Sequence, residues 1–406
     1  MAISGGEQDD ESDYEAFLHI VHLSDMHYRD ESGASDLRME RGARKIAGYF
    51  QRCGAQGLSE WMLRKWHQGT AGQDSTAHER LCTFLTKFAD NPQFAGVETW
   101  LLDTGDLSSL GDLGSLQNAV ACLKEYQDIL GASKLLTLYG NHDAWPGKFP
   151  LRASRKELHA HRTQMRSTKL FPPSWPMMPL SIAIPHCQSR VLLQGVSSVI
   201  DDRWLNARAL GRVGIDPNWL PAREGVHQLR KLAADAEQHW HADGSTRDFR
   251  ILAVHHPIHY PPPRPTWTMH MKNDADVADA LAAFSQKGRG KLAQLVLSGH
   301  THETYPAWGE LPAQVAAHVY SPLTAGQVQL VAGSQAQATY TEGGKLKKRE
   351  QALPQEFQIL TFFAAPRSAH RQLVIERRVV RRTNNNGPYD LMKSGDGEVE
   401  AITLSY

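Results

Sequence analysis

Five short apolar runs, each of β-strand length, end abruptly in small and ionisable residues. The runs occupy residues 17–23, 97–102, 134–139, 250–254 and 292–297. Few polar residues interrupt them, which is typical of strands buried on both faces. The residues that follow them are, in chain order, Asp25 and His27, then Asp106, then Asn141, His142 and Asp143, then His255, then His300 and His302. A fold that buries all five runs therefore carries five polar clusters at its strand ends.

Apolar residues at helical spacing separate several of these runs. The pattern predicts helices over residues 115–130, 226–240 and 274–284. Alternation of strands and helices indicates an α/β fold with a largely parallel sheet. In such sheets the functional residues collect at the carboxyl ends of the strands, which is where all five clusters lie.

We expect one domain over residues 17–385, with a mobile acidic tail at 1–16 and a polar tail at 386–406. Two segments interrupt the strand–helix alternation. Residues 35–91 are predicted to be a helical insertion, and residues 145–225 a loop-rich insertion. Further strands are predicted by β-branched and aromatic content at 191–199, 327–332, 356–363 and 372–380.

The formal net charge is zero, because 44 basic side chains balance 44 acidic ones. This balance gives no general attraction to nucleic acid or to an anionic membrane. No apolar stretch is long enough to span a membrane, and the first residues lack the basic and apolar character of a secretory leader. We therefore expect a cytoplasmic protein without a membrane partner. The sequence does not predict an oligomeric state.

Histidine and cysteine are the residue types that most often bind transition metals. The chain has 20 histidines, so their spacing must distinguish ligands from ordinary side chains. Its four cysteines are far apart and form no C-x-x-C pair, which argues against a thiolate zinc site. His78, on a predicted helix, is expected to be exposed, whereas His19 and His22 on the first predicted strand are expected to pack.

The polar clusters together resemble the calcineurin-like metallophosphoesterase superfamily. Its pattern is D-x-H, G-D, G-N-H-[DE], H and G-H-x-H, and every element is present here in order. The matching residues are Asp25 and His27, Gly105 and Asp106, the run from Gly140 to Asp143, His255, and Gly299, His300 and His302. The resemblance covers roughly residues 18–335. It implies a four-layer αββα sandwich, here with a helical insertion and late β-strands.

The resemblance also implies a dinuclear metal-dependent phosphoesterase, a phosphodiesterase or phosphatase that attacks a phosphate ester with a metal-bound hydroxide. Two divalent ions would clamp the phosphate oxygens and lower the pKa of a bound water. Mn, Fe and Zn all suit the mixed donor set. The implied ligands of the first ion are Asp25, His27 and His302; those of the second are Asn141, His255 and His300; and Asp106 bridges the two.

His142 and Asp143 are the implied catalytic residues. His142 would stabilise the transition state or protonate the leaving oxygen, and Asp143 would hold its ring nitrogen. His256 is more simply interpreted as a supporting residue than as a ligand. If the strands continue through the motifs, alternation points Asp25 and His27 to one face, and likewise His300 and His302.

Each residue also has an ordinary interpretation, since Asp and Asn are common in caps and turns. Seven donors in the right order at five strand ends are not explained in that way. The expected partner is a small phosphorylated substrate, with a phosphodiester favoured. A nuclease acting on DNA or RNA is the alternative, although the zero net charge disfavours nucleic acid. A non-catalytic scaffold with the same fold is disfavoured by the complete ligand set.

Overall fold

The computed structural model describes most of the predicted elements. The described residues are 14–28, 45–60, 75–109, 111, 113–143, 163, 171, 175–199, 211–214, 227–238, 248–260, 270–286, 291–302, 305–308, 327–335, 339–342, 349–352, 355–364, 372–382, 387–391 and 399–405. Two sheets of seven and six strands form the centre of the molecule, and a separate ribbon pairs β10 (Thr339–Glu342) with β11 (Arg349–Ala352).

The first sheet joins strands from both ends of the chain. Its order is β14 (Tyr389–Leu391), β13 (Gln372–Arg382), β12 (Glu356–Ala364), β1 (Glu15–Leu23), β2 (Glu98–Asp103) and β3 (Lys134–Thr137), with β15 (Val399–Ser405) also paired to β13. Strands β1, β2 and β3 are parallel, whereas β12 runs antiparallel to β1. The carboxyl ends of β1, β2 and β3 therefore lie at one edge of this sheet.

The second sheet is parallel at its centre and antiparallel at both margins. Its order is β4 (Leu180–Ala183), β5 (Arg190–Gly195), β6 (Phe249–Ala253), β7 (Leu295–Ser298), β9 (Val328–Val331) and β8 (Tyr305–Trp308). The four strands from β5 to β9 in this order are parallel. The carboxyl ends of β6 and β7, which precede two of the polar clusters, therefore lie side by side.

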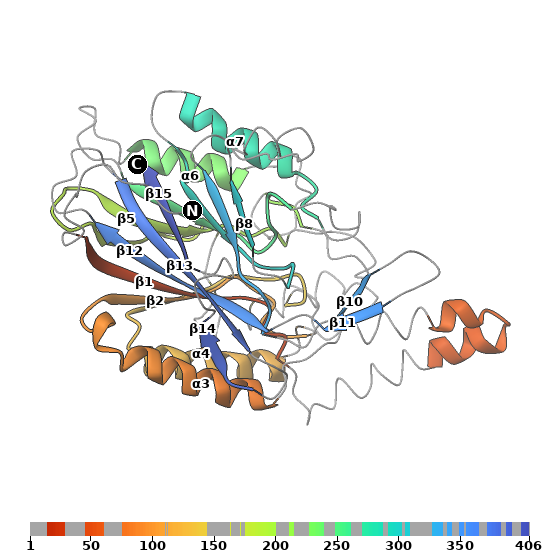
Figure 1. Cartoon of the computed structure of the whole chain (residues 1–406). Coiled ribbons are helices and arrows are strands. Elements are labelled where there is room, and N and C mark those ends of the chain that lie inside the picture. The colour runs from red at the N-terminus through yellow and green to blue at the C-terminus, as the bar shows by residue number, and fades with distance from the viewer. Residues whose placement is uncertain are drawn as a thin grey trace.

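Helices cover the outer face of each sheet, which gives the four-layer αββα order (Figure 1). Helices α3 (Ser75–Ala89) and α4 (Leu113–Leu130) pack against the first sheet, and α6 (His227–Gln238) and α7 (Asp274–Gln286) against the second. Residues 45–52 and 56–60 are also helical, and a short 3-10 turn, η2, spans Pro92–Phe94. None of the described helices is long and apolar enough to span a membrane.

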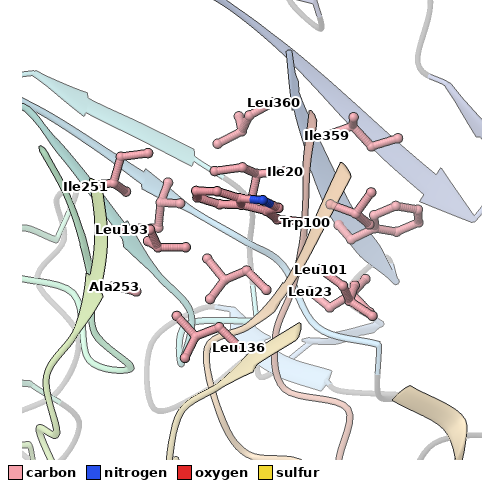
Figure 2. Close-up of a cluster of buried hydrophobic side chains, with 14 of the residues drawn as sticks. Ile20, Leu23, Trp100, Leu101, Leu136, Leu193, Ile251, Ala253, Ile359 and Leu360 are labelled. Carbon is pink, nitrogen blue, oxygen red and sulfur yellow. The ribbon is translucent and has the colours of Figure 1, made fainter. Parts of the chain in front are cut away.

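The main core lies between the two sheets, because each strand points alternate side chains to opposite faces. Trp100 and Ile20 face Leu193 and Ile251 of the second sheet, whereas Leu101 points to the opposite face (Figure 2). All five are almost fully buried. Apolar burial on this scale, at roughly 25 cal/mol per Å², is the main force that holds the sheets together.

The same alternation links the second sheet to its helices. In β6, Ile251 and Ala253 belong to the core between the sheets, while Leu252 packs on the other side with Leu229 of α6 and Leu281 of α7. The near-continuous apolar run that predicted this strand is therefore explained by burial on both faces.

The polar tail predicted at 386–406 is wrong. Residues 389–391 and 399–405 are strands β14 and β15 of the first sheet, and Tyr389, Ile402 and Leu404 are buried. In β15, Ile402 and Leu404 alternate with polar residues and so form one apolar face. The segment is short and mostly polar, and that composition predicted a tail and not a strand.

The two predicted insertions also contain core elements. Helix α3 lies within the predicted helical insertion, yet its Leu81, Leu85 and Phe88 are buried beneath the first sheet, in an apolar cluster that is continuous with the core between the sheets. Strands β4 and β5 lie within the predicted loop-rich insertion and form one margin of the second sheet. Much of both insertions, including residues 61–74 and 144–162, lies outside the described residues.

Candidate metal centre

The five polar clusters converge at the strand ends, where the two sheets meet. Backbone hydrogen bonds hold the loops together: Asp25 donates to Gly105 at 2.9 Å, and Gly299 donates to His255 at 3.0 Å. The amide of His300, from the second sheet, donates to Oδ2 of Asp25, from the first sheet, at 2.7 Å. One ionisable side chain thus joins the two halves of the fold.

The converging side chains depend on an unusual backbone rather than on strand alternation. Strands β1, β2 and β7 end before the motifs. Five predicted ligands then have a left-handed φ: Asp25 (51°), His27 (46°), Asp106 (58°), His300 (73°) and His302 (63°). Non-glycine residues rarely adopt this conformation, and such residues cluster at functional sites. The explanation of side-chain direction by strand parity is therefore wrong, although the predicted convergence is observed.

Two motif glycines are required by close packing. A Cβ on Gly140 would collide with the carboxylate and backbone nitrogen of Asp106, and a Cβ on Gly299 would collide with the side chain of Ser24 and meet Oδ2 of Asp25 at 2.8 Å. Any larger residue at either position would therefore displace a predicted ligand.

One donor group contains Asp25, His27 and His302. The Nε2 atoms of the two histidines are 3.1 Å apart. Oδ1 of Asp25 is 3.7 Å from Nε2 of His27 and 3.4 Å from Nε2 of His302. This Oδ1 atom is buried without a hydrogen-bond donor. A buried carboxylate oxygen facing two imidazole nitrogens fits a divalent cation, whose charge would satisfy all three.

A second donor group contains Asn141, His255 and His300. Oδ1 of Asn141 is 3.0 Å from Nε2 of His255, and the His255 and His300 rings are 5.0 Å apart. Oδ2 of Asp106 lies 3.3 Å from Nε2 of His255 and 4.0 Å from Nε2 of His27. The Asp106 carboxylate thus lies between the two groups, and all seven predicted ligands are brought together.

The electrostatics favour ionised carboxylates at this site. Burial opposes ionisation of Asp25, but the nearby imidazoles of His27 and His302 hold its pKa well below the usual value. For Asp106, the charges of His255 and His142 outweigh burial in the same way and lower its pKa. Burial also disfavours the cationic form of His255, yet Asp106 raises its pKa to about 9. The two carboxylates therefore stay ionised despite burial, and a cation bound at this site would replace the extra proton that His255 carries.

A buried hydrogen-bond network orients His255 from behind. Its Nδ1 atom donates to the carbonyl oxygen of Thr104 at 2.9 Å, which directs Nε2 toward the donor group. The Thr104 hydroxyl accepts from Nε2 of His22 at 3.1 Å. Nδ1 of His22 accepts from Gln358 at 2.8 Å, and Gln358 accepts from Arg377 at 2.8 Å. The sequence predicted that His22 packs on the first strand, but it gave no signal for the hydrogen bond to Gln358, which is 336 residues away in the chain.

His142 lies at the margin of the donor groups. Its ring is 4.5 Å from that of His27, and its Nε2 atom is 4.0 Å from Oδ2 of Asp106. Burial lowers the pKa of His142 to about 4, although Asp106 counteracts the shift. Its side chain remains 12% exposed, whereas that of Asp106 is 1% exposed. His142 can therefore face both the metal centre and a substrate.

The contact predicted between Asp143 and the ring of His142 is wrong. Nδ1 of His142 is instead 2.8 Å from the carbonyl oxygen of Ser109. Asp143 accepts hydrogen bonds from the backbone amides of Leu107, Ser108 and Gly140. Its carboxylate thus ties the loop after β3 to the loop after β2. Every residue but proline has a backbone amide, so a carboxylate that satisfies three buried amides leaves no recognisable mark in the sequence.

His256, which the sequence predicts to be a supporting residue, lies beside the predicted ligands. Its Nδ1 atom is 2.8 Å from the hydroxyl of Ser198, and its ring is 4.2 Å from that of His300. His255, His256 and His300 offer nitrogens close enough to share a cation. The interpretation of His256 as a supporting residue stays a prediction.

The family assignment follows from a match that covers all of these motifs. The model of the calcineurin-like phosphoesterases matches residues 18–304. The chain belongs to this family. One similar solved structure is the sulfate thiohydrolase SoxB of Thermus thermophilus in complex with glycerol, with 13% identity, a TM-score of 0.38, and coverage of 84% of this chain and 57% of that one. No curated protein matches the sequence.

Proposed function

We propose that this family member is a dinuclear metal-dependent phosphoesterase that hydrolyses the phosphate ester of a small molecule. The observation that carries the proposal is the position of Asp106, whose Oδ2 atom lies between His27 of one donor group and His255 of the other. A single carboxylate between two sets of imidazole and oxygen donors is the arrangement that a pair of divalent ions requires.

The first ion would be held by Asp25, His27 and His302, and the second by Asn141, His255 and His300, with Asp106 shared. When bound, the two ions would supply positive charge for the phosphate oxygens and lower the pKa of a water molecule. Mn²⁺, Fe and Zn²⁺ all suit these oxygen and nitrogen donors. The network behind His255 keeps its ring oriented, so the site does not have to reorganise as substrate charge develops.

His142 is the residue proposed to act on the substrate. Its Nδ1 atom donates to the carbonyl of Ser109, so Nε2 is the nitrogen that points toward the donor groups. To donate to the leaving oxygen as the phosphorus–oxygen bond breaks, Nε2 would need a second proton, because Nδ1 keeps its own. Burial lowers the pKa of His142 and opposes this cationic form, whereas the negative charge of a bound phosphate ester would favour it. We favour a phosphodiester of a small molecule, because the zero formal net charge provides no general attraction to a long polyanion.

The test is a turnover screen of the purified protein reconstituted with Mn²⁺, Fe²⁺ or Zn²⁺. Its arms are a nitrophenyl phosphodiester, a nitrophenyl phosphomonoester, cyclic nucleotides, and short DNA and RNA. Asp106→Asn should abolish turnover, whereas Asp90→Asn, the same change at an exposed position, should leave it intact. Turnover confined to nucleic acid would favour the nuclease alternative, and activity that survives in Asp106→Asn would refute the dinuclear site.

A further inference from the structure

A second group of metal-ligand side chains lies away from the phosphoesterase centre, between helices α3 and α4. These helices pack against each other beneath the first sheet (Figure 1). His78 and Cys82 are four residues apart on α3, so they share one face of the helix. Glu125 approaches them from α4, and the three side chains offer ligand atoms that lie within 4.8 Å of one another.

Two of the three distances between these atoms are close to those of a tetrahedral coordination sphere. Nε2 of His78 is 3.2 Å from Oε2 of Glu125. Sγ of Cys82 is 3.6 Å from Oε1 of Glu125 and 3.9 Å from Nε2 of His78. Around a tetrahedral Zn²⁺, with bonds of about 2.3 Å to sulfur and 2.0 Å to nitrogen or oxygen, ligand atoms are roughly 3.3–3.6 Å apart. The distances from Glu125 to Nε2 and to Sγ are close to this range, whereas the 3.9 Å between Sγ and Nε2 is longer, so Cys82 must move toward Nε2 for all three atoms to bind one ion.

Neighbouring groups already orient the ligands. Nδ1 of His78 is 2.9 Å from the hydroxyl of Tyr126, a residue whose side chain is fully buried. With a proton on Nδ1, Nε2 carries the lone pair and lies beside Oε2 of Glu125. Sγ of Cys82 is 4.0 Å from Nδ1 and 3.9 Å from Nε2, so the Cys82 side chain must rotate toward the Nε2 side to share a cation with it. An imidazole held through its second nitrogen is the usual arrangement of a metal-bound histidine. The expectation that His78 is simply exposed is therefore wrong, because its side chain is only 27% exposed and is held on both sides.

We propose that His78, Cys82 and Glu125 form a mononuclear site for a zinc-type divalent cation, with a fourth position open to water. The thiol sulfur selects a borderline or soft ion over Mg²⁺ or Ca²⁺. This site differs from the phosphoesterase centre, because none of the seven ligands there is a cysteine. The bound ion clips α3 to α4 and so stabilises one outer layer of the fold.

Binding at this site must displace one proton from the thiol. Burial and the charge of Glu125 raise the pKa of Cys82 to about 12, so without an ion the thiol remains protonated and donates to Glu125. The cation replaces that proton, the Sγ atom becomes a thiolate ligand, and the proton leaves to solvent. Affinity therefore rises with pH. The ligands of this site come from two helices and form no C-x-x-C pair, so the sequence gave no signal for it.

The test uses sulfur as a spectroscopic label. Co²⁺ bound to a thiolate gives an intense near-ultraviolet charge-transfer band, which the oxygen and nitrogen donors of the phosphoesterase centre cannot produce. Co²⁺ titration of the full chain should give this band, saturating at about one thiolate-bound ion per chain. Zn²⁺ in equal amount should remove the band, and a large excess of Mg²⁺ should not.

Variants assign the band to its residues. Cys82→Ser should abolish it, and Glu125→Gln should weaken Co²⁺ affinity at least tenfold. Cys53→Ser is the matched control, since Cys53 is an exposed cysteine outside these helices, and it should leave the band unchanged. Thermal unfolding and circular dichroism would establish that each variant is folded. Absence of the band in the wild-type chain, or an undiminished band in Cys82→Ser, would overturn the proposal. Neither result depends on phosphoesterase activity.

Discussion

Nδ1 of His142 lies 2.8 Å from the carbonyl oxygen of Ser109, so a backbone group rather than a carboxylate orients this ring. The neighbouring carboxylate of Asp143 instead binds the amides of two loops. Adjacent residues of one motif therefore have separable tasks. His142 faces the chemistry, and Asp143 holds the loop that presents it.

We expect Asp143→Ala to destabilise the fold as well as reduce activity. The substitution leaves the amides of Leu107, Ser108 and Gly140 buried without their acceptor. Each unsatisfied group costs about 1–3 kcal/mol, so a total loss of at least about 2 kcal/mol is expected. Urea unfolding of the metal-free protein measures it. An unchanged midpoint, with only kcat reduced, would restore the predicted catalytic role of Asp143.

Gly299→Ala should weaken metal binding more than it weakens the fold. The added Cβ collides with the side chain of Ser24 and must displace Asp25, whose Oδ1 atom faces the first donor group. Overpacking of this kind costs about 1–3 kcal/mol, and here the cost falls on a ligand. Isothermal titration with Mn²⁺ should show at least tenfold weaker binding. Gly48→Ala has open space around its Cβ and is the control. Equal Mn²⁺ affinity in the two variants would contradict the tight packing at Gly299.

Metal content tests the shared position of Asp106. Mn²⁺-reconstituted protein should contain about two ions per chain at this centre. Asp106→Ala should lower that number, because its carboxylate lies between the two donor groups. Reconstitution with Mn²⁺ rather than Zn²⁺ limits binding at the thiol-containing group. Plasma emission analysis after gel filtration gives the stoichiometry. A value near one that Asp106→Ala leaves unchanged would mean that no carboxylate is shared.

The sequence predicted the parts of the fold that depend on local pattern. Apolar runs ending in polar clusters placed β1, β2, β3, β6 and β7 within a few residues of their observed bounds, and helical periodicity placed α4, α6 and α7. These elements bury whole faces, so their periodicity is strong. The short marginal strands β4, β8, β14 and β15 were missed. Each depends on a neighbouring strand rather than on a long apolar pattern of its own.

The candidate site was predictable as a set of residues but not as a geometry. Motif order predicted seven donors that the structure brings together, yet the left-handed backbone at Asp25 and His300 has no side-chain signal. Backbone acceptors such as the carbonyls of Thr104 and Ser109 cannot be predicted from residue type either, because every residue has a carbonyl. Contacts between distant segments, such as His78 with Glu125, appear only after the helices pack.

Stability should depend on pH through His19, which is remote from the metal centre. Burial, aided by the charge of Arg378, lowers its folded-state pKa from 6.5 to about 4. The unfolded chain therefore binds a proton that the folded chain excludes. The contribution of neutral His19 to the free energy of unfolding is fully present above pH 6.5. This contribution falls by roughly 3 kcal/mol as the pH is lowered to 4. The difference in unfolding free energy between wild type and His19→Gln should shrink over this range. A constant difference would show that His19 is protonated equally in both states.

The role of His142 is best tested with two leaving groups. His142 is not a predicted ligand, so His142→Ala should retain its metals, which metal analysis checks first. Its proposed work occurs as charge develops on the leaving oxygen, so the substitution should lower kcat far more than it raises KM. General acid catalysis contributes roughly 10²–10⁴-fold, and the loss should approach this on an alkyl ester. On a nitrophenyl ester the loss should be much smaller, because nitrophenolate leaves without a proton. An equal loss on both esters would instead favour electrostatic stabilisation by the ring, and loss of the metals would make His142 a ligand.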